Sequence, residues 1–558
     1  MKGKLYILLL GAVFLTAFIF RFYKLGEIPH GFYQDESAIG YNAYSILKTG
    51  KDEYGKSFPL YFKSFGDYKL PLYIYATVPS VAVFGMTEFA VRFPSAFFGF
   101  LTVIVFYFLA LRLFNNKNFA LLSAFLLAIN PWHIHYSRAT FEVSICLFLF
   151  ILGTLLIHEY FNKRRAGAFI LGTISFLLAM YGYNLTRILS PILYFIVLYS
   201  FRKKDSKISG EIWVSAAASL IALIPFAVSL LGKGGASSAS GTLVFSSAAV
   251  QAPLLEFRSY FVFLPNIVSS LFFGKVTMTV WQILQNIASY LSVSFFFVSG
   301  STHGNHGIGN VGQFYLFELP LIITGIVIFI KDKHSKLLFL WATAVILVAS
   351  LTRDIPHATR SYFLIFPMIL FSAKGATYFF DKVRSLKASY SAVLSVLVLG
   401  IISYSIIFYL ASYYFRFPIF YAKSWRSADK DVAFFIEQNQ RKYSHIVFDN
   451  SAGYIYTSLL FYSKYNPYDF INTVTRSSDD SEGFSHVLTF GKYEFKDVDW
   501  AKDYKKDTLI ITTADQKPKD ISSLKVFYYP KRPIVITKGQ EIIQYPIEET
   551  AYVMVEGK

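Results

Sequence analysis

The stretch LYILLLGAVFLTAFIFRFYKLG, residues 5–26, decides how the rest of the chain is interpreted. Its apolar part, residues 5–20, has the composition of either a secretory signal peptide or a membrane-spanning helix. A signal peptide ends at a cleavage site of small residues, and here the segment RFYKLG follows instead. We therefore predict that residues 5–22 form a retained first span, which opens into a long polar loop over 23–92.

The composition places most of the chain in a membrane. Of its 558 residues, 54% are hydrophobic, 19% are aromatic and 16% are charged. Soluble domains contain about 25% charged residues, so most of this chain is expected to face lipid or other helices. The single cysteine, Cys146, lies inside an apolar run. This excludes a disulfide framework and a thiolate metal cage.

The net charge of +18 does not indicate nucleic-acid binding, because the charge is unevenly distributed. Residues 412–558 contain 20 Lys and Arg against 19 Asp and Glu, and the remainder contains 33 against 16. The excess belongs to the apolar part, where basic cytoplasmic loops and anionic lipid both account for it. We predict membrane lipid, and no nucleic acid, as a partner.

Short basic segments divide the apolar part into spans. They are NNKN (115–118), NKRR (162–165), RKKDSK (202–207), KDKHSK (331–336) and DKVRSLK (381–387). Placing them and the N-terminus on the cytoplasmic side predicts eleven spans, near 5–22, 93–114, 118–132, 139–160, 166–183, 187–201, 209–231, 314–330, 337–352, 360–380 and 388–411. The C-terminal tail is then extracytoplasmic, and the inner basic loops indicate a plasma (inner) membrane.

Two further apolar segments do not fit this alternation. Residues 71–85 contain two prolines and are short, and a span there would move every later basic loop to the outer side. Residues 276–298 are long enough to span but contain two glutamines and an asparagine. We predict that 71–85 lies along the outer interface and that 276–298 is interfacial or re-entrant. The Gly- and Ser-rich segment 232–249 predicts a mobile flap.

The composition changes after Tyr414. Helix-like ADKDVAFFIEQNQ is followed by strand-like HIVFDN, and LIITT, KVFYY and PIVIT predict further strands. The predicted fold class is a polytopic α-helical membrane protein of about 11 spans, with outer-face interfacial helices and a small C-terminal α/β soluble domain. We place the domains at 1–411 and 412–558. No motif in the tail indicates its role.

Polar residues at the outer ends of spans are the candidates for chemistry, because polar groups at membrane depth are unfavourable without a function or a partner. In GFYQDESAIG (31–40), Asp35 and Glu36 stand together where a helix is predicted to begin. Acids at a helix start also favour the macrodipole, an alternative that suits Glu36 better than Asp35. In GDYKLPLY (66–73), Lys69 precedes the interfacial helix, and an ordinary interface lysine is its alternative.

Two more outer-face segments carry ionisable side chains. In NPWHIHYSRATFEV, Arg138 and Glu142 are four residues apart, which predicts one helix face and leaves a structural ion pair as the alternative. In LTRDIPHATR, His357 and Arg360 open the next span, where snorkelling cations are the alternative. By the predicted topology all these residues face the same compartment.

Histidines also gather on this side of the predicted membrane. They include His303 and His306 in the segment HGNH, whose spacing permits metal binding. Two histidines on a Gly-rich loop are more typical of solvated side chains, so we assign no metal ligands.

Taken as a set, these segments resemble a known family. The DE pair of the first loop, the K-x-P-L-Y segment, EFAVRFPSAFFGFL, PWHIHYSRATFE and IPHATRSYFLIFP are similar to motifs of the membrane glycosyltransferases with the C-type fold. The resemblance covers about residues 1–410. It is nearest to the dolichyl-phosphate-mannose protein mannosyltransferase and aminoarabinose transferase branches, and it does not extend to the tail.

The resemblance implies a polyprenyl-phosphate-linked sugar as donor, used on the outer face of the membrane. The catalytic first-loop carboxylate of the family falls on Asp35, with Glu36 as a supporting neighbour. Lys69 matches the phosphate-binding lysine, although the segment here reads KLPLY instead of KPPLY. Further phosphate candidates are Arg138, Arg360 and His357, and a second outer-face acid of the family falls on Glu142.

The chemistry of such a transfer suits these residue types. A carboxylate can take the proton of an acceptor hydroxyl as it attacks the anomeric carbon, and attack on the far face inverts that centre. The lipid phosphate departs readily and needs cations to hold it. Participation of a divalent cation is left open, as are the sugar and the acceptor, which is a protein, a lipid or a glycan.

Three other functions remain as alternatives. A flippase or transporter for lipid-linked sugars would explain the many spans, but the sequence lacks the internal repeats typical of transporters. An oligosaccharide ligase or polymerase that uses a lipid pyrophosphate would need the same outer-face cations. A scaffold whose exported tail binds a partner is the third.

Overall fold

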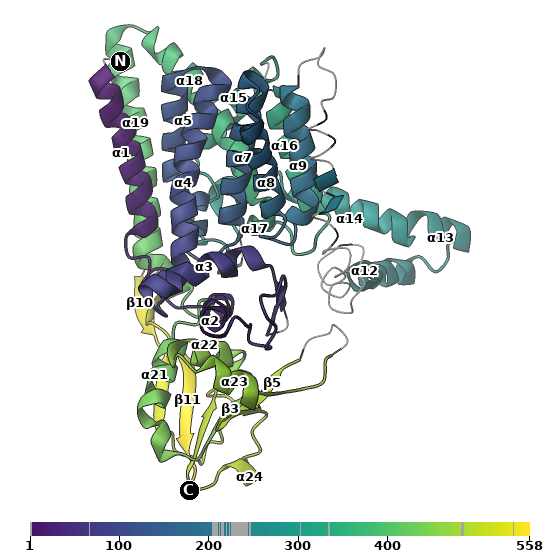
Figure 1. Ribbon diagram of the computed structural model, residues 1–558, viewed down its shortest axis with the longest axis vertical. Coiled ribbons are helices and arrows are strands. Elements are labelled where there is room, and N and C mark those ends of the chain that lie inside the picture. Colours follow the sequence, from purple (N-terminus) through teal and green to yellow (C-terminus); the bar gives the residue numbers. More distant parts are fainter. Residues whose placement is uncertain are drawn as a thin grey trace. The chain divides into compact units, whose positions relative to one another are not determined.

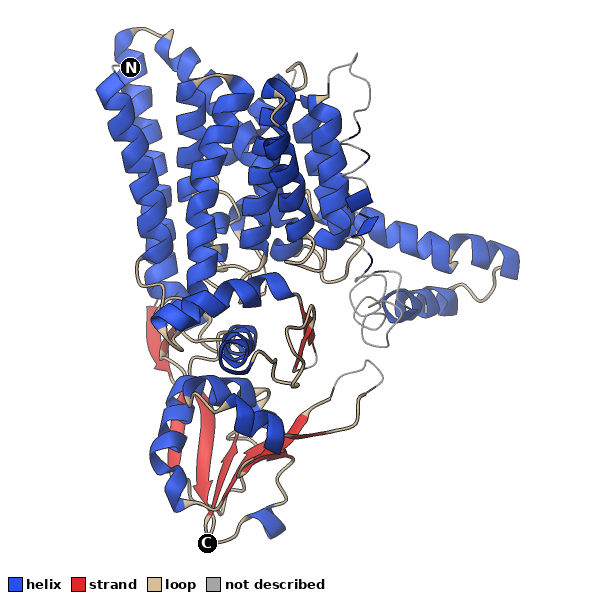
Figure 2. Cartoon of the chain, in the orientation of Figure 1, coloured by secondary structure: helices blue, strands red, loops and turns tan. Residues whose placement is uncertain are grey.

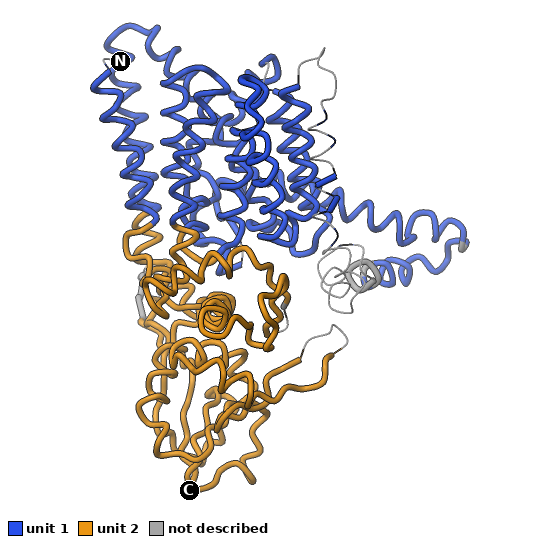
Figure 3. The backbone as a smooth tube through the Cα atoms, viewed as in Figure 1, with its two compact units in different colours: residues 1–21, 97–137, 141–409 blue, residues 22–96, 138–140, 410–558 orange. Residues whose placement is uncertain are grey.

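The computed structural model describes residues 3–65, 67–202, 247–301, 303–332, 335–480, 485–538 and 541–558, with isolated positions between 210 and 244. Helices dominate, and most strands follow residue 440 (Figures 1 and 2). The chain divides into two compact units (Figure 3). Unit 1 comprises 1–21, 97–137 and 141–409, and unit 2 comprises 22–96, 138–140 and 410–558. The predicted span 209–231 and flap 232–249 lie largely outside the described residues.

Unit 1 is helical. Its longer helices are α1 (Gly3–Phe22), α4 (Glu88–Phe114, from Phe97 on), α5 (Lys117–Ile129), α7 (Val143–Lys163), α8 (Ala166–Ala179), α9 (Thr186–Phe201), α15 (Glu318–Phe329), α16 (Ser335–Ser350), α18 (Ile365–Arg384) and α19 (Ala388–Ala411). Shorter helical segments are α6 (Pro131–Tyr136), α17 (Ala358–Ser361), η1 (Ser294–Val298) and η2 (Tyr362–Leu364). Three helices project from the side of this bundle (Figure 1), namely α12 (Ser247–Tyr260), α13 (Asn266–Phe272) and α14 (Lys275–Ser289).

Six helical stretches among the described residues are long and apolar enough to cross a membrane. They are Gly3–Phe22, Glu88–Phe114, Val143–Lys163, Ile267–Val298, Ala358–Arg384 and Ala388–Phe420. Shorter apolar helices fall on the other predicted spans within the described part of the chain. The protein is therefore a multi-pass membrane protein, as predicted. Eleven spans and the orientation of the termini stay predictions.

The two segments that broke the predicted alternation are both helical. Residues 71–85 form α3 (Pro71–Phe84) in unit 2, with Pro71 in the first turn, where its missing N–H is harmless. Residues 276–298 form most of α14 and all of η1. They belong to the stretch Ile267–Val298, which by length and composition is a candidate span and is mostly exposed within unit 1. An interfacial position for either segment stays a prediction.

Close helix packing inside unit 1 depends on two glycines. A Cβ added to Gly325 on α15 would lie 1.9 Å from the carbonyl oxygen of Phe371 on α18. Reciprocally, a Cβ on Gly375 of α18 would lie 1.9 Å from the carbonyl oxygen of Leu321. Small residues let helix backbones approach closely within a membrane, where van der Waals contact replaces the hydrophobic effect. These two helices therefore form the tightly packed part of the bundle.

Unit 2 joins the first loop to the region after residue 410. The first loop contributes α2 (Gln34–Thr49), the hairpin β1 (Phe62–Ser64) and β2 (Asp67–Lys69), and α3. On α2, the Ser37 hydroxyl donates to Thr457 Oγ1 over 2.8 Å, and Gly40 packs against Phe461. The compact units are therefore defined by tertiary contacts and combine segments that are distant in the chain. The division predicted at 411/412 instead separates the chain into two continuous parts.

The region after residue 410 contains a mixed sheet with helices. The seven strands are ordered β4 (Thr475–Arg476), β5 (Val487–Phe490), β6 (Tyr493–Lys496), β3 (His445–Asp449), β7 (Thr508–Thr512), β11 (Thr550–Glu556) and β8 (Lys525–Tyr528). The strand β3 runs parallel to β6 and β7, and the other pairings are antiparallel. Central parallel strands are apolar along their length, which explains the buried residues of HIVFD and TLIIT. The helices of this region are η3 (Ser412–Arg416), α20 (Phe417–Phe420), α21 (Asp429–Asn439), η4 (Gln440–Lys442), η5 (Asn450–Ala452), α22 (Ile455–Tyr462), α23 (Pro467–Thr473) and α24 (Trp500–Asp503). A separate antiparallel hairpin is formed by β9 (Arg532–Lys538) and β10 (Glu541–Ile547).

Candidate active site

Asp35 and Lys69, predicted as base and phosphate ligand, form an ion pair in unit 2. Asp35 lies in the first turn of α2, and Lys69 ends the β1–β2 hairpin directly before α3. The Lys69 ammonium donates a short hydrogen bond to Asp35 Oδ1 and lies 4.8 Å from the centre of the Phe65 ring. The Asp35 side chain is 35% exposed and that of Lys69 is 4% exposed. The site therefore presents a carboxylate with a lysine fixed behind it.

Glu36, the adjacent acid, is fully buried and faces Arg92 on the first turns of α4. The Arg92 guanidinium donates from Nε to Glu36 Oε1 over 2.9 Å and from Nη2 to Oε2 over 2.8 Å. Burial raises the pKa of Glu36, and the charge and hydrogen bonds of Arg92 oppose that shift. Bidentate pairing of this kind fixes orientation as well as charge.

Arg92 also holds the segment that leads into α2. Its Nη1 donates to the carbonyl oxygens of Leu25 and Pro29, over 3.3 and 2.9 Å, and its Nη2 donates to that of Gly31 over 2.6 Å. The residues before Asp35 are thus bound to the same guanidinium as Glu36. The pair of Glu36 and Arg92 consequently positions the turn that carries Asp35.

Arg138 and Glu142 do not share a helix face, so that prediction is wrong. The helix α6 ends at Tyr136 and α7 begins at Val143, with a turn between them. Arg138, in unit 2, is fully buried. Its Nη2 donates to the Ile28 carbonyl oxygen over 3.1 Å, and its guanidinium lies 5.5 Å from the rings of Tyr413 and Tyr414. This enclosure suits a cation that fixes the loop, and the predicted phosphate contact of Arg138 stays untested.

The same turn returns to Glu36. The Thr140 N–H donates to Glu36 Oε1 over 3.3 Å, two residues before Glu142 in the chain. Glu142 itself belongs to unit 1 and immediately precedes α7. The contact anchors in unit 2 the loop that leads to Glu142.

His357 and Arg360 lie in unit 1, at the turn into α17. The Arg360 Nη1 donates to Thr352 Oγ1 over 3.0 Å and to the Arg353 carbonyl oxygen. His357 Nδ1 accepts the N–H of Thr359 over 3.2 Å, and burial lowers the pKa of the ring. His357 is therefore neutral with its proton on Nε2, so it can donate a hydrogen bond to a phosphate but cannot supply charge.

A small polar cavity lies at this turn. Its volume is about 230 Å³, and it is lined by Val244, Gln282, Asn286, Thr352, Arg353, Asp354 and Ile355. The amide of Asn286 donates to the carbonyl oxygens of Ser350 and Thr352, over 2.9 and 3.3 Å. The glutamine and asparagine of 276–298 thus serve contacts within unit 1.

Three histidine rings come together in unit 1, one more than the sequence pair suggested. The ring centres of His303, His306 and His357 are 4.6 to 5.9 Å apart. His306 Nδ1 bonds to the Thr359 hydroxyl over 3.0 Å, and burial lowers its pKa to about 3. No group of three or more His, Cys, Asp or Glu that could hold a metal ion is found among the described residues. Metal ligands remain unassigned.

Arg92 is the residue that the sequence analysis missed. A signal was present, since it is the only basic residue in the mostly apolar segment EFAVRFPSAFF. An ionisable residue in an apolar helix is unfavourable unless it has a partner. Its partner, Glu36, is 56 residues away in the chain, a pairing that no local pattern specifies.

Comparison with known proteins agrees with this architecture. A family model described as dolichyl-phosphate-mannose-protein mannosyltransferase matches residues 69–231. An uncharacterized protein from Aquifex aeolicus (strain VF5) is 30% identical over 169 residues, which make up 30% of this chain and 33% of that protein. The chain thus matches about a third of the length of this relative.

Two solved structures share the fold. The structure of ArnT from Cupriavidus metallidurans bound to undecaprenyl phosphate has a TM-score of 0.52 at 12% identity, over 100% of this chain and 98% of that chain. The Archaeoglobus fulgidus oligosaccharyltransferase, tethered with an acceptor peptide containing the NVT sequon, has a TM-score of 0.51 at 13% identity, over 92% and 69%. At these identities the likeness shows the fold alone.

The helical bundle and these likenesses define a fold class: the chain has the C-type fold that is seen in these membrane glycosyltransferases. Within that class, the predicted resemblance to the dolichyl-phosphate-mannose protein mannosyltransferase and ArnT group is confirmed.

Proposed function

We propose that this protein is an integral membrane glycosyltransferase that moves a sugar from a polyprenyl-phosphate carrier to an acceptor hydroxyl, with Asp35 as the base. The observation that supports it best is the arrangement of Asp35 and Lys69. A partly exposed carboxylate and a lysine are held side by side by α2 and the β1–β2 hairpin. Base and phosphate ligand are the two groups that such a transfer requires.

In this mechanism the acceptor oxygen attacks the anomeric carbon from the face opposite the carrier. Its proton passes to Asp35, the new C–O bond forms, and the bond between the anomeric carbon and the phosphate oxygen breaks. The electron pair leaves with the polyprenyl phosphate, and the anomeric centre is inverted. Lys69 donates its hydrogen bond to Asp35 Oδ1. The second carboxylate oxygen, Oδ2, takes the proton of the acceptor hydroxyl.

Lys69 holds the departing phosphate by charge. Its ammonium, which pairs with Asp35, supplies the positive charge that a departing phosphate requires. Arg360, Arg138 and His357 are further phosphate contacts proposed from the family resemblance, and Glu142 orients the acceptor or binds a divalent ion. The sugar is a hexose or a pentose, the transfer occurs on the extracytoplasmic face of the plasma membrane, and the product belongs to the cell envelope.

The test is turnover of radiolabelled polyprenyl-phosphate sugars by the purified full-length protein in lipid. Release of free polyprenyl phosphate is expected from the unaltered protein and from Glu27→Gln, an exposed acid of the same loop. Asp35→Asn is expected to bind the donor without turnover. Turnover of a polyprenyl-diphosphate oligosaccharide, with release of polyprenyl diphosphate and no turnover of the monophosphate sugars, would replace the proposal by a ligase or polymerase. Saturable binding without turnover, unchanged by Asp35→Asn, would replace it by a flippase.

A further inference from the structure

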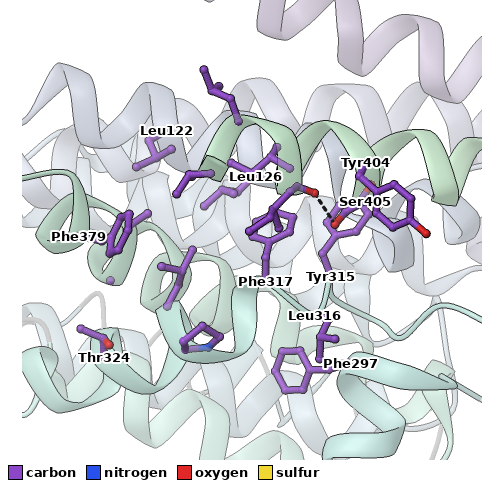
Figure 4. Close-up of a pocket in the computed structure, with 18 of the residues that line it drawn as sticks. Leu122, Leu126, Phe297, Tyr315, Leu316, Phe317, Thr324, Phe379, Tyr404 and Ser405 are labelled. Carbon is purple, nitrogen blue, oxygen red and sulfur yellow. Dashed lines mark hydrogen bonds between the residues drawn. The ribbon is translucent and has the colours of Figure 1, made fainter. Parts of the chain in front are cut away.

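A large apolar cavity in unit 1 lies between α19 and the helices α5, α15 and α18. Its volume is about 950 Å³, within the range of small-molecule sites. Figure 4 shows the side chains that line it, which come from several helices and are mostly aliphatic or aromatic. They include Leu122, Leu126, Phe297, Phe317, Phe379 and Tyr404. The cavity is therefore suited to hydrocarbon.

The helix α19 makes little direct contact with the rest of the bundle. Tyr409 is its one buried residue. The Tyr409 hydroxyl donates to the Pro131 carbonyl oxygen over 3.3 Å, and its ring meets Tyr315 edge to face at 6.1 Å. Further along the helix, Ile401 and Ser405 line the cavity, and Figure 4 shows Ser405 among the side chains around it.

This arrangement contrasts with the glycine-mediated packing of α15 on α18. Helices associate in a membrane through van der Waals contact, and α19 lacks that contact over the length of the cavity. An unfilled space would leave its lining side chains without dispersion partners. Something of hydrocarbon character is needed to complete the packing, and the surrounding lipid is the available source.

The charge at the cavity indicates which lipid fits. Among the described residues that line it, Lys382 alone is charged. Lys382 lies in the last turn of α18 and belongs to the basic segment DKVRSLK (381–387), which is predicted to be cytoplasmic. At the other end, Asn310 and Val311 line the cavity and no described lining residue is a cation. An anionic headgroup therefore fits the Lys382 end.

We propose that this cavity binds a phospholipid with an anionic headgroup, whose acyl chains fill the space between α19 and the bundle and whose headgroup lies at Lys382. This lipid binding goes beyond the proposed function and does not depend on it. A polyprenyl phosphate used on the outer face would place its phosphate at the end without a cation. The bound lipid acts as a structural wedge that holds α19 in place.

The experiment uses the full-length protein, delipidated in detergent and titrated with phosphatidylglycerol or phosphatidylcholine of identical acyl chains. Native mass spectrometry counts the retained lipid, and thermal unfolding reports its effect on the fold. We expect phosphatidylglycerol to bind about fivefold more tightly, the effect of one lysine beside an anionic headgroup. Lys382→Gln should abolish this preference and Lys382→Arg should keep it. The matched control is Lys374→Gln, on the same helix but outside the cavity, which should behave like the unaltered protein.

A second variant tests the cavity itself. Ser405→Trp places an indole in the space from the α19 side and should abolish retention of both lipids. A headgroup preference that survives in Lys382→Gln, or lipid retention that survives in Ser405→Trp, would overturn the proposal. Displacement of phosphatidylglycerol by added polyprenyl phosphate would also overturn it, because the occupant would then be the carrier.

Discussion

The first turn of α2 carries two neighbouring carboxylates in opposite settings. Asp35 meets Lys69 through one oxygen and keeps 35% of its side chain exposed. Glu36 meets Arg92 through both oxygens, and neither of these side chains is exposed. Successive residues on a helix point about 100° apart, so one acid faces outward while the next enters the core.

This difference indicates that Asp35 serves the chemistry and that Glu36 supports the fold. A base must have an oxygen that a substrate can reach, and only Asp35 of the two combines exposure with an oxygen outside its ion pair. Glu36 has both oxygens engaged by Arg92 and Thr140. Two acids that look equivalent in the sequence thus differ in how many of their oxygens are engaged by neighbouring residues.

Replacing the exposed acid should have the largest effect on activity. Asp35→Asn keeps the shape of the side chain and removes its basicity, so kcat should fall by about 10²–10⁴-fold. Donor binding should persist, because the lysine remains. Turnover of radiolabelled donor measures the first quantity, and equilibrium binding of polyprenyl phosphate measures the second. A variant with unchanged kcat would remove Asp35 from the role of base.

Replacing the buried acid should instead destabilise the protein. Glu36→Ala leaves the Arg92 guanidinium buried without its carboxylate, and breaking such a pair typically reduces stability by about 3–5 kcal/mol. The midpoint of thermal unfolding in detergent should fall clearly, and activity should be lost only with the fold. Glu27→Gln, an exposed acid of the same loop, serves as the control and should leave the midpoint unchanged. A Glu36→Ala protein that keeps its stability but loses its activity would show that Glu36 takes part in the chemistry, contrary to this assignment.

The contrast also shows what the sequence could predict. Apolar runs between basic breaks located the helices, because span length and flanking charge are local properties. The DE pair and Lys69 were found because ionisable residues are rare in this composition. The membrane class was predictable on that basis, whereas the C-type fold was expected only from the resemblance of the motifs to a known family.

Contacts between distant segments were not predictable. Ser37 bonds to Thr457, 420 residues away, and Glu36 bonds to Arg92, 56 residues away. Spacing alone also failed at Arg138 and Glu142, because the helix α6 stops at Tyr136 and the four-residue rule applies only within a helix. Pairing of this kind depends on the tertiary fold.

Removing the lysine should affect donor binding more than turnover. Lys69→Met keeps the length of the side chain and the packing on Phe65 while removing the charge. A hydrogen bond to a charged group contributes about 1.5–3 kcal/mol, so the KM for donor should rise by about 10–100-fold. The matched control is Lys63→Met, on the same hairpin, where the lysine meets Asp479 instead. An equal rise in KM for both variants would indicate a general effect of charge near the membrane.

The smallest expected effect completes the contrast between the two acids. Asp35→Asn should change the free energy of unfolding by only about 1 kcal/mol, because pairs that reach water contribute little. The asparagine carbonyl oxygen can still accept the hydrogen bond of Lys69, which limits the penalty for the buried ammonium. Thermal unfolding of Asp35→Asn beside Glu36→Ala measures the difference directly. Equal destabilisation by both would show that the Asp35 pair is as structural as the Glu36 pair, and the loss of turnover in Asp35→Asn would then no longer identify a base.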